Sequence, residues 1–143
     1  MALRVLVVDD NDLVRAALCD ILKSQSDIEI VCEASNGSDA VHLVREHNPD
    51  LVLLDIAMPV MNGFDAIRLI KHAAPQTQLL IVSQFDSPAF LRQAMTVGAT
   101  GYVKKHEAGK TLISEVRRIQ RSFPTRRPNE VEYPSDPNGS LAS

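Results

Sequence analysis

Short runs of β-branched and aliphatic residues alternate along this chain with segments in which apolar residues recur at helical spacing, and this alternation limits the folds it can adopt. The first run, Leu3–Val8, is apolar except for Arg4, as is typical of a strand covered on both faces. From Leu13 onward the apolar positions follow a helical period, with Asn11 or Asp12 available as the N-cap. The repeating unit is therefore a strand followed by a helix.

The same unit recurs along the rest of the chain. The expected strands are 3–8, 28–34, 51–54, 79–83 and 101–103, and the expected helices begin at 13 and cover 38–47, 63–71, 88–96 and 107–122. Alternating elements with short loops predict an α/β fold, a doubly wound five-stranded parallel sheet with helices on both faces. Ligands of such sheets bind outside the carboxyl ends of the strands, so the functional site is expected there.

The length of 143 residues suits one domain, which we expect to cover residues 1–122. Residues 123–143 hold four of the eight prolines and show no periodic pattern, so they are interpreted as a linker or a C-terminal tail.

The charge balance argues against a nucleic-acid-binding chain. The net charge of -3 leaves no basic field, so we expect no nucleic acid bound directly, and the short apolar runs predict no membrane span and a cytoplasmic protein. Three arginines of the last expected helix, Arg117, Arg118 and Arg121, are predicted to face outward as a solvated surface, with a dimer face as the alternative.

Carboxylates follow two of the expected strands. Asp9 and Asp10 come directly after the first strand and Asp55 directly after the third, so a parallel sheet should bring them to one edge. Crowded carboxylates repel one another unless a cation neutralises them. Mg²⁺ suits such a site because it prefers oxygen ligands and binds through a few carboxylates together with phosphate oxygens.

Two further polar residues are expected at the same edge, Ser83 after the fourth strand and Lys105 after the fifth. A hydroxyl and an ammonium beside a metal-bound carboxylate can hold the oxygens of a phosphoryl group in transfer, and Asp55 could act as the nucleophile. Taken singly, each residue is as well explained by a helix cap, a turn or a solvated charge. The prediction depends on their occurring together.

The combination resembles the receiver domain of two-component response regulators. The stretches that carry the resemblance are VLVVDDND at 5–12, LVLLDIAMPVMNG at 51–63, VSQ at 82–84 and GATGYVKK at 98–105, within a match covering about residues 3–122. It implies a flavodoxin-like fold with strand order 2-1-3-4-5. It also implies that Asp55 is phosphorylated and that Asp9, Asp10, Asp55 and the backbone carbonyl of Ala57 bind Mg²⁺.

The resemblance assigns the remaining roles too. It makes Ser83 the switch hydroxyl, Tyr102 the switch aromatic residue and Lys105, three residues after Tyr102, the phosphate-binding lysine in preference to Lys104. Gly63 is expected to allow the turn into its helix. His106 stands where many receivers have proline, as in receivers attached to LuxR-type helix-turn-helix domains.

The function implied is a phosphorylation switch and not an enzyme, although it would assist its own phosphotransfer and dephosphorylation. A histidine kinase, a phosphotransfer protein or a small phosphodonor would supply the phosphoryl group. The surface formed by 88–96, 101–103 and 107–122 would then meet a partner or a second copy, and the expected output is control of transcription. The alternatives are a Mg²⁺-dependent phosphohydrolase with an Asp nucleophile, disfavoured because Ala57 stands where its general acid is needed, and a docking module that has lost phosphorylation.

Overall fold

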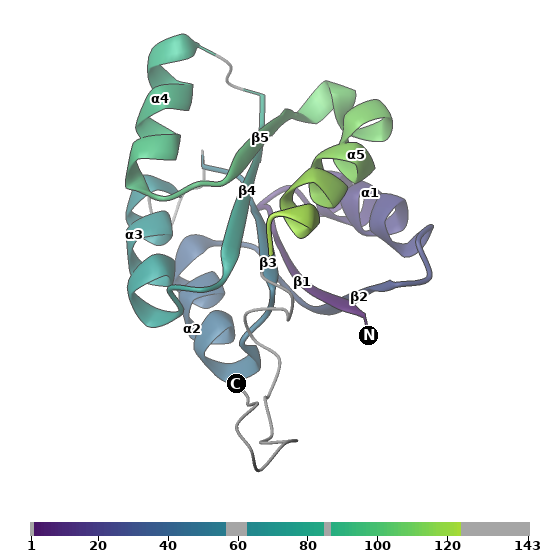
Figure 1. Ribbon diagram of the computed structural model, residues 1–143, viewed down its shortest axis with the longest axis horizontal. Helices are drawn as coiled ribbons and strands as arrows, with labels where there is room; N and C mark the ends of the chain where they lie inside the picture. Colours follow the sequence, from purple (N-terminus) through teal and green to yellow (C-terminus); the bar gives the residue numbers. More distant parts are fainter. Residues whose placement is uncertain (1, 57–62, 85–86, 124–143) are drawn as a thin grey trace, which may run out of the picture.

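A computed structural model of the chain describes residues 2–56, 63–84 and 87–123. These residues form a layered arrangement of strands and helices (Figure 1). In chain order the elements are β1 (Leu3–Val8), α1 (Asp12–Lys23), β2 (Ile28–Ala34), α2 (Gly37–His47), β3 (Leu51–Leu54), α3 (Gly63–Ala73), β4 (Gln78–Ser83), α4 (Pro88–Val97), β5 (Gly101–Lys104), the 3-10 helix η1 (Lys105–Glu107) and α5 (Ala108–Arg121).

The strands form one parallel sheet in the order β2-β1-β3-β4-β5, which confirms the predicted fold class and strand order. Helices α1 and α5 cover one face, and α2, α3 and α4 cover the other (Figure 1). Side chains of β1 alternate between the two cores: Leu6 and Val8 contribute to the core under α2, α3 and α4, while Val5 and Val7 contribute to the core under α1 and α5. Burial on both faces explains why the central strands are continuously apolar.

Side-chain caps account for two of the differences between the expected and observed helix boundaries, those at the starts of α1 and α2. The side chain of Asn11 accepts hydrogen bonds from the backbone N–H groups of Leu13 and Val14, so Asn11 and not Asp12 is the N-cap of α1. The side chain of Asn36 caps α2 in the same way, which moves the start of that helix to Gly37. Before α5 the chain makes the 3-10 turn η1, which helical periodicity did not predict.

The prediction that three arginines of α5 simply face solvent is wrong for Arg117. Its guanidinium donates two hydrogen bonds to Asp27, at 2.7 and 2.9 Å, and a third to Gln25 at 3.0 Å. These contacts tie α5 to the connection between α1 and β2, and they hold the pKa of Asp27 below its usual range. Arg118, although exposed, pairs with Glu115 and donates to the carbonyl of Thr100.

No helix among residues 2–56, 63–84 and 87–123 combines the length and apolar character needed to cross a membrane.

Gly63 is required for a close approach and not for a left-handed turn. Its φ lies outside the positive range, and its N–H donates to the carbonyl of Ile56 at 3.1 Å. A Cβ at this position would overlap the backbone of Ile56, the residue that directly follows Asp55. The packing of α3 against the end of β3 therefore constrains the backbone beside Asp55.

We predict that Gly63→Ala lowers the free energy of unfolding by about 2–3 kcal/mol, because the added methyl group forces the backbone of Ile56 to move. Gly109→Ala is the matched control, since a Cβ at Gly109 has no neighbour within 4 Å. As Gly109 lies in α5, that control should leave stability unchanged or raise it by up to about 1 kcal/mol. Urea unfolding of both variants measures the difference, and equal stabilities would contradict the packing argument.

Candidate functional site

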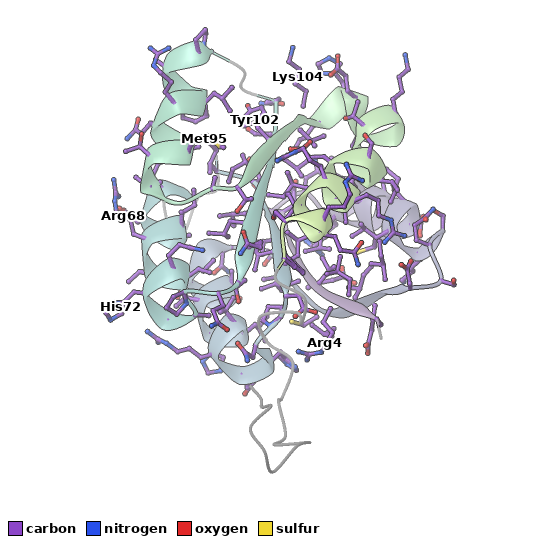
Figure 2. All side chains as sticks on the ribbon, in the orientation of Figure 1. Arg4, Arg68, His72, Met95, Tyr102 and Lys104 are labelled. Atoms are coloured by element: carbon purple, nitrogen blue, oxygen red, sulfur yellow. The ribbon has the colours of Figure 1, made fainter. Side chains whose placement is uncertain are left out.

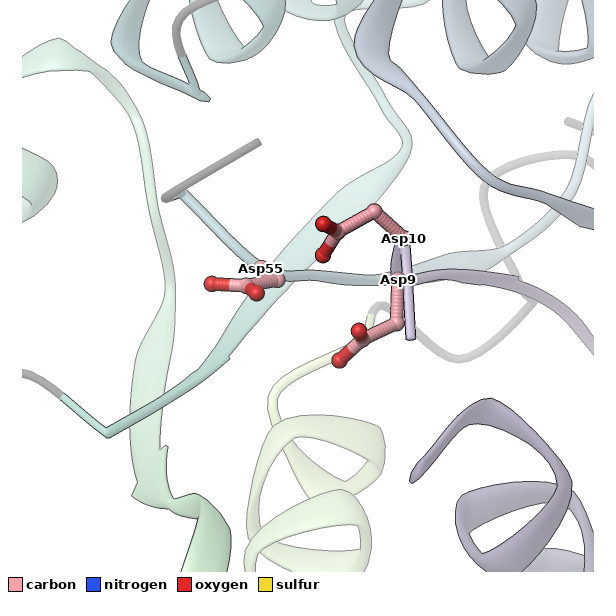
Figure 3. Close-up of side chains that lie close together, drawn as sticks. All are labelled: Asp9, Asp10 and Asp55. Carbon is pink, nitrogen blue, oxygen red and sulfur yellow. The ribbon is translucent and has the colours of Figure 1, made fainter. Parts of the chain in front are cut away.

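Three carboxylates lie together at the carboxyl edge of the sheet. Asp9 and Asp10 follow β1, Asp55 follows β3, and the two strands are paired up to their last residues, Val8 and Leu54. One oxygen from each carboxylate can be chosen so that all three lie within 4.8 Å of one another. Figure 3 shows the three side chains directed into a common space. Strand pairing therefore brings together groups separated by more than forty residues of sequence.

Lys105 places a single ammonium in this cluster. Its Nζ lies 2.9 Å from Oδ2 of Asp9 and 2.9 Å from Oδ2 of Asp55. Lys105 is the first residue after β5, whereas its neighbour Lys104 is still in the strand and pairs in register with Ser83. The contacts thus distinguish the two adjacent lysines: within the described residues, Lys105 is the one that bridges the carboxylates.

Burial and charge act together on these groups. Asp9 and Asp55 are buried, with 1% and 4% of their surface exposed, whereas Asp10 is exposed. Burial raises the pKa of Asp9, opposed by the N–H of Asn11 and by Lys105. Burial acts to lower the pKa of Lys105, but its hydrogen bonds to Asp55 and Asp9 outweigh this effect and raise it. The two carboxylates together bind the ammonium of Lys105 strongly. Its single positive charge, however, neutralises neither carboxylate completely.

Sequence reasoning did not predict two contacts to Asp9 that hold the loop between β1 and α1. Oδ1 of Asp9 accepts a hydrogen bond from the N–H of Asn11 at 2.9 Å, and the guanidinium of Arg15 donates to the carbonyl of Asp9 at 2.7 Å. The polar side chain of Asn11 was a usable signal for the helix cap, but its contact with Asp9 comes from the backbone N–H, which any residue other than proline could supply. Arg15 carried no comparable signal, because its contacts depend on how α1 packs against neighbouring elements.

The remaining predicted site residues lie on two neighbouring strands or outside the described residues. Ser83 ends β4 and is fully buried, at the same edge of the sheet as the carboxylates. Tyr102 lies in β5, is half-buried and packs against the core under α2, α3 and α4; Figure 2 shows it on β5, with Met95 on α4. Ala57 falls within 57–62, outside the described residues.

The cluster is suited to binding a hard cation. The cluster holds three carboxylates, and the one ammonium of Lys105 bridges two of them, so negative charge remains in excess at a site where two of the acids are buried. Oxygen donors in this number are the ligands that Mg²⁺ takes, with open positions left for water or phosphate. The donor set therefore fits a divalent cation together with an anionic ligand.

The family follows from a match to the model of the response regulator receiver domain, which covers residues 5–117. The chain belongs to this family. Two curated relatives agree with it. The receiver is 32% identical over 117 residues to the transcriptional regulatory protein LnrK of Bacillus subtilis, and 35% identical over 121 residues to the response regulator protein VraR of Staphylococcus aureus.

These matches cover 82% and 85% of the receiver but only 53% of LnrK and 58% of VraR, so the chain spans about half the length of the curated relatives it matches. A solved two-component response regulator of the LuxR family from Aurantimonas is 29% identical, with a TM-score of 0.81 and 89% of each chain covered. Receiver domains are regulatory switches of two-component systems. Among the relatives, LnrK is named as a transcriptional regulatory protein. The comparisons give no support to the phosphohydrolase hypothesis.

We predict that Asp10→Asn stabilises the receiver when divalent cations are removed, by on the order of 1 kcal/mol, because it relieves repulsion among the three carboxylates. The same change should abolish most of the stabilisation that Mg²⁺ gives the wild type, since a ligand that binds only the folded state raises its stability. Urea unfolding with EDTA and with excess MgCl₂ measures both effects.

Asp20→Asn provides the matched control, because Asp20 is an exposed carboxylate of α1 outside the cluster. It should respond to Mg²⁺ as the wild type does. If Mg²⁺ stabilised Asp10→Asn and the wild type equally, the cation would bind elsewhere.

Proposed function

We propose that this receiver accepts a phosphoryl group on Asp55 in a Mg²⁺-dependent reaction and thereby switches a surface that a partner or a second copy recognises. The observation that carries the proposal is the bridging of Asp9 and Asp55 by Lys105 within a cluster of three carboxylates. Capping or turn formation requires no such cluster. A nucleophile, a cation site and an anion-binding ammonium together are what phosphoryl transfer needs.

Mg²⁺ would be held by Asp9, Asp10 and Asp55, with the backbone carbonyl of Ala57 as a further ligand. The excess negative charge of the cluster supports this assignment. When bound, the ion would neutralise charge on the phosphoryl oxygens during transfer. The exposure of Asp10 leaves a path from solvent to the cluster.

In the transfer step, a carboxylate oxygen of Asp55 forms the new bond to phosphorus. The bond between phosphorus and the donor atom breaks, and its electron pair leaves with the donor, either the imidazole of a phosphohistidine or the acetate of acetyl phosphate. Lys105 would exchange its contact with Asp55 for a contact with a phosphoryl oxygen, which keeps a positive charge beside the developing negative charge. The receiver would also assist hydrolysis of the acyl phosphate through the same groups: a water oxygen bonds to phosphorus, the bond from Asp55 to phosphorus breaks, and inorganic phosphate leaves.

The switch would run from Ser83 to Tyr102. Ser83 is buried at the end of β4, and Tyr102 lies on the neighbouring strand, paired in register with Ile81 two residues before Ser83. A phosphoryl group adds about -1.5 to -2 charge with strong acceptor oxygens, which would draw the hydroxyl of Ser83 toward it. Tyr102 would then move inward and alter the face of α4, β5 and α5, our candidate surface for a homodimer.

The wider role rests on the family and the length of the relatives. A histidine kinase or phosphotransfer protein would be the donor, and residues 123–143 would link the receiver to an output domain that controls transcription. The net charge of -3 supports the proposal that the output domain, and not this chain, would bind DNA. Such a regulator would act in the cytoplasm.

We predict that Asp55→Asn abolishes labelling by radioactive acetyl phosphate in the presence of Mg²⁺, because the amide oxygen is a poor nucleophile and cannot form the acyl phosphate. Asp20→Asn, an exposed control, should be labelled like the wild type. Label retained by Asp55→Asn at another residue would refute the assignment. Repeated turnover of a small phosphate ester by the wild type would instead favour a phosphohydrolase.

The two adjacent lysines offer a second matched test. Lys105→Ala should retain Mg²⁺ binding but lower the rate of labelling by about 100-fold, because the ammonium that stabilises the transferring group is lost. Lys104→Ala should have a much smaller effect, since Lys104 lies in β5 and is not the lysine that bridges the carboxylates. Equal losses in the two variants would contradict the role given to Lys105.

A further inference from the structure

Arg15 makes three contacts that converge on the loop between β1 and α1. Its Nη1 donates to the backbone carbonyl of Asp9 at 2.7 Å, its Nη2 to Oδ1 of Asp12 at 2.8 Å, and its Nε to Oε1 of Glu33 at 3.1 Å. The Arg15 side chain is only 18% exposed. Each nitrogen position of the guanidinium therefore has a defined acceptor.

The carbonyl that Arg15 holds belongs to the peptide group between Asp9 and Asp10. The rest of Asp9 is also fixed, since its N–H donates to the carbonyl of Ala34 at 3.1 Å and its carboxylate accepts from Asn11. Asp10 has an exposed side chain, and the orientation of the preceding peptide plane determines where its backbone lies. Arg15 thus fixes the peptide group that connects the buried Asp9 to the exposed Asp10.

The two acidic partners keep the guanidinium on that carbonyl. Asp12 binds it from the first turn of α1, and Glu33 binds it from β2. Glu33 reaches this position because β2 contains a register shift opposite Val5 and Leu6, after which Glu33 pairs with Val7, a residue of the face covered by α1. The carboxylate cluster is then left with Lys105 as its bridging cation.

We infer that Arg15 is a positioning residue that orients Asp10 for cation binding by holding the peptide group between Asp9 and Asp10, with Asp12 and Glu33 holding Arg15 in turn. This inference rests on the proposed Mg²⁺ site and adds to it residues that do not bind the metal but hold the groups that would. Such outer contacts commonly change metal affinity 10–100-fold when removed.

The test uses Mn²⁺ as the probe, followed by electron paramagnetic resonance in titrations of the 143-residue chain. Arg15→Gln should raise the Kd for Mn²⁺ by about 10-fold. A role of Arg15 through its charge alone predicts the opposite sign, because removing a cation near the cluster would strengthen Mn²⁺ binding. Arg15→Lys, which keeps the charge but cannot make three contacts, should not restore the affinity.

A kinetic measurement separates positioning from loss of structure. In labelling by acetyl phosphate, Arg15→Gln should need about 10-fold more MgCl₂ for half its maximal rate, while the rate at saturating MgCl₂ stays near that of the wild type. Arg117→Gln is the matched control, because it breaks a comparable set of contacts from α5 to Asp27. It should lower stability and leave the MgCl₂ requirement unchanged.

The outcomes distinguish the inference from the proposal beneath it. Unchanged or tighter Mn²⁺ binding by Arg15→Gln, with binding lost in Asp10→Asn, would overturn the role of Arg15 alone. No Mn²⁺ binding by the wild type would overturn the metal site and the inference together. If Arg15→Gln does not fold, Glu33→Gln is used in its place, because that variant keeps Arg15 but weakens its contact with β2. Glu33→Gln should also raise the Kd for Mn²⁺. An unchanged Kd would count against the inference.

Discussion

The ammonium of Lys105, shared between Asp9 and Asp55, is the contact that makes this sheet edge a workable site. Two buried carboxylates side by side would repel each other at a cost that a folded domain could not easily absorb. One lysine reduces that repulsion but leaves negative charge in excess. The site is therefore held together by Lys105 without a metal ion and still attracts one. That residual charge links the stability of the fold to its proposed chemistry.

Acidic residues are tolerated at this edge because the stability of the sheet does not depend on them. The strands β1 and β3 are buried on both faces, and their side chains enter two separate cores, so apolar packing fixes the strand ends from which Asp9 and Asp55 project. The apolar residues that stabilise the fold are thus different from the acidic residues that form the site. Gly63 is a point of contact between the two, since its lack of a side chain lets α3 approach the backbone next to Asp55.

The architecture was predictable because its signals are local. Each strand showed as an apolar run and each helix as a periodic one, and the parallel topology then placed Asp9, Asp10 and Asp55 at one edge by geometry alone. The residues by themselves placed Lys105 at this edge, and the family pattern preferred it to Lys104; the ion pairs now support that choice. Helices α1 and α2 start one residue earlier than expected because the side-chain caps Asn11 and Asn36, and not periodicity, set their starts.

The contacts around Arg15 and Arg117 could not be read from the sequence, because both depend on registers between elements far apart in the chain. The register shift in β2 is the clearest case. Without it Glu33 would pair with Val8 and point toward α2, and Arg15 would lose its partner on the sheet. One extra residue in an edge strand thus decides which face carries a carboxylate. The carboxylate of Glu33 binds the guanidinium of Arg15, which in turn binds the peptide group beside Asp10. The register shift in β2 therefore influences the position of the exposed acid of the site.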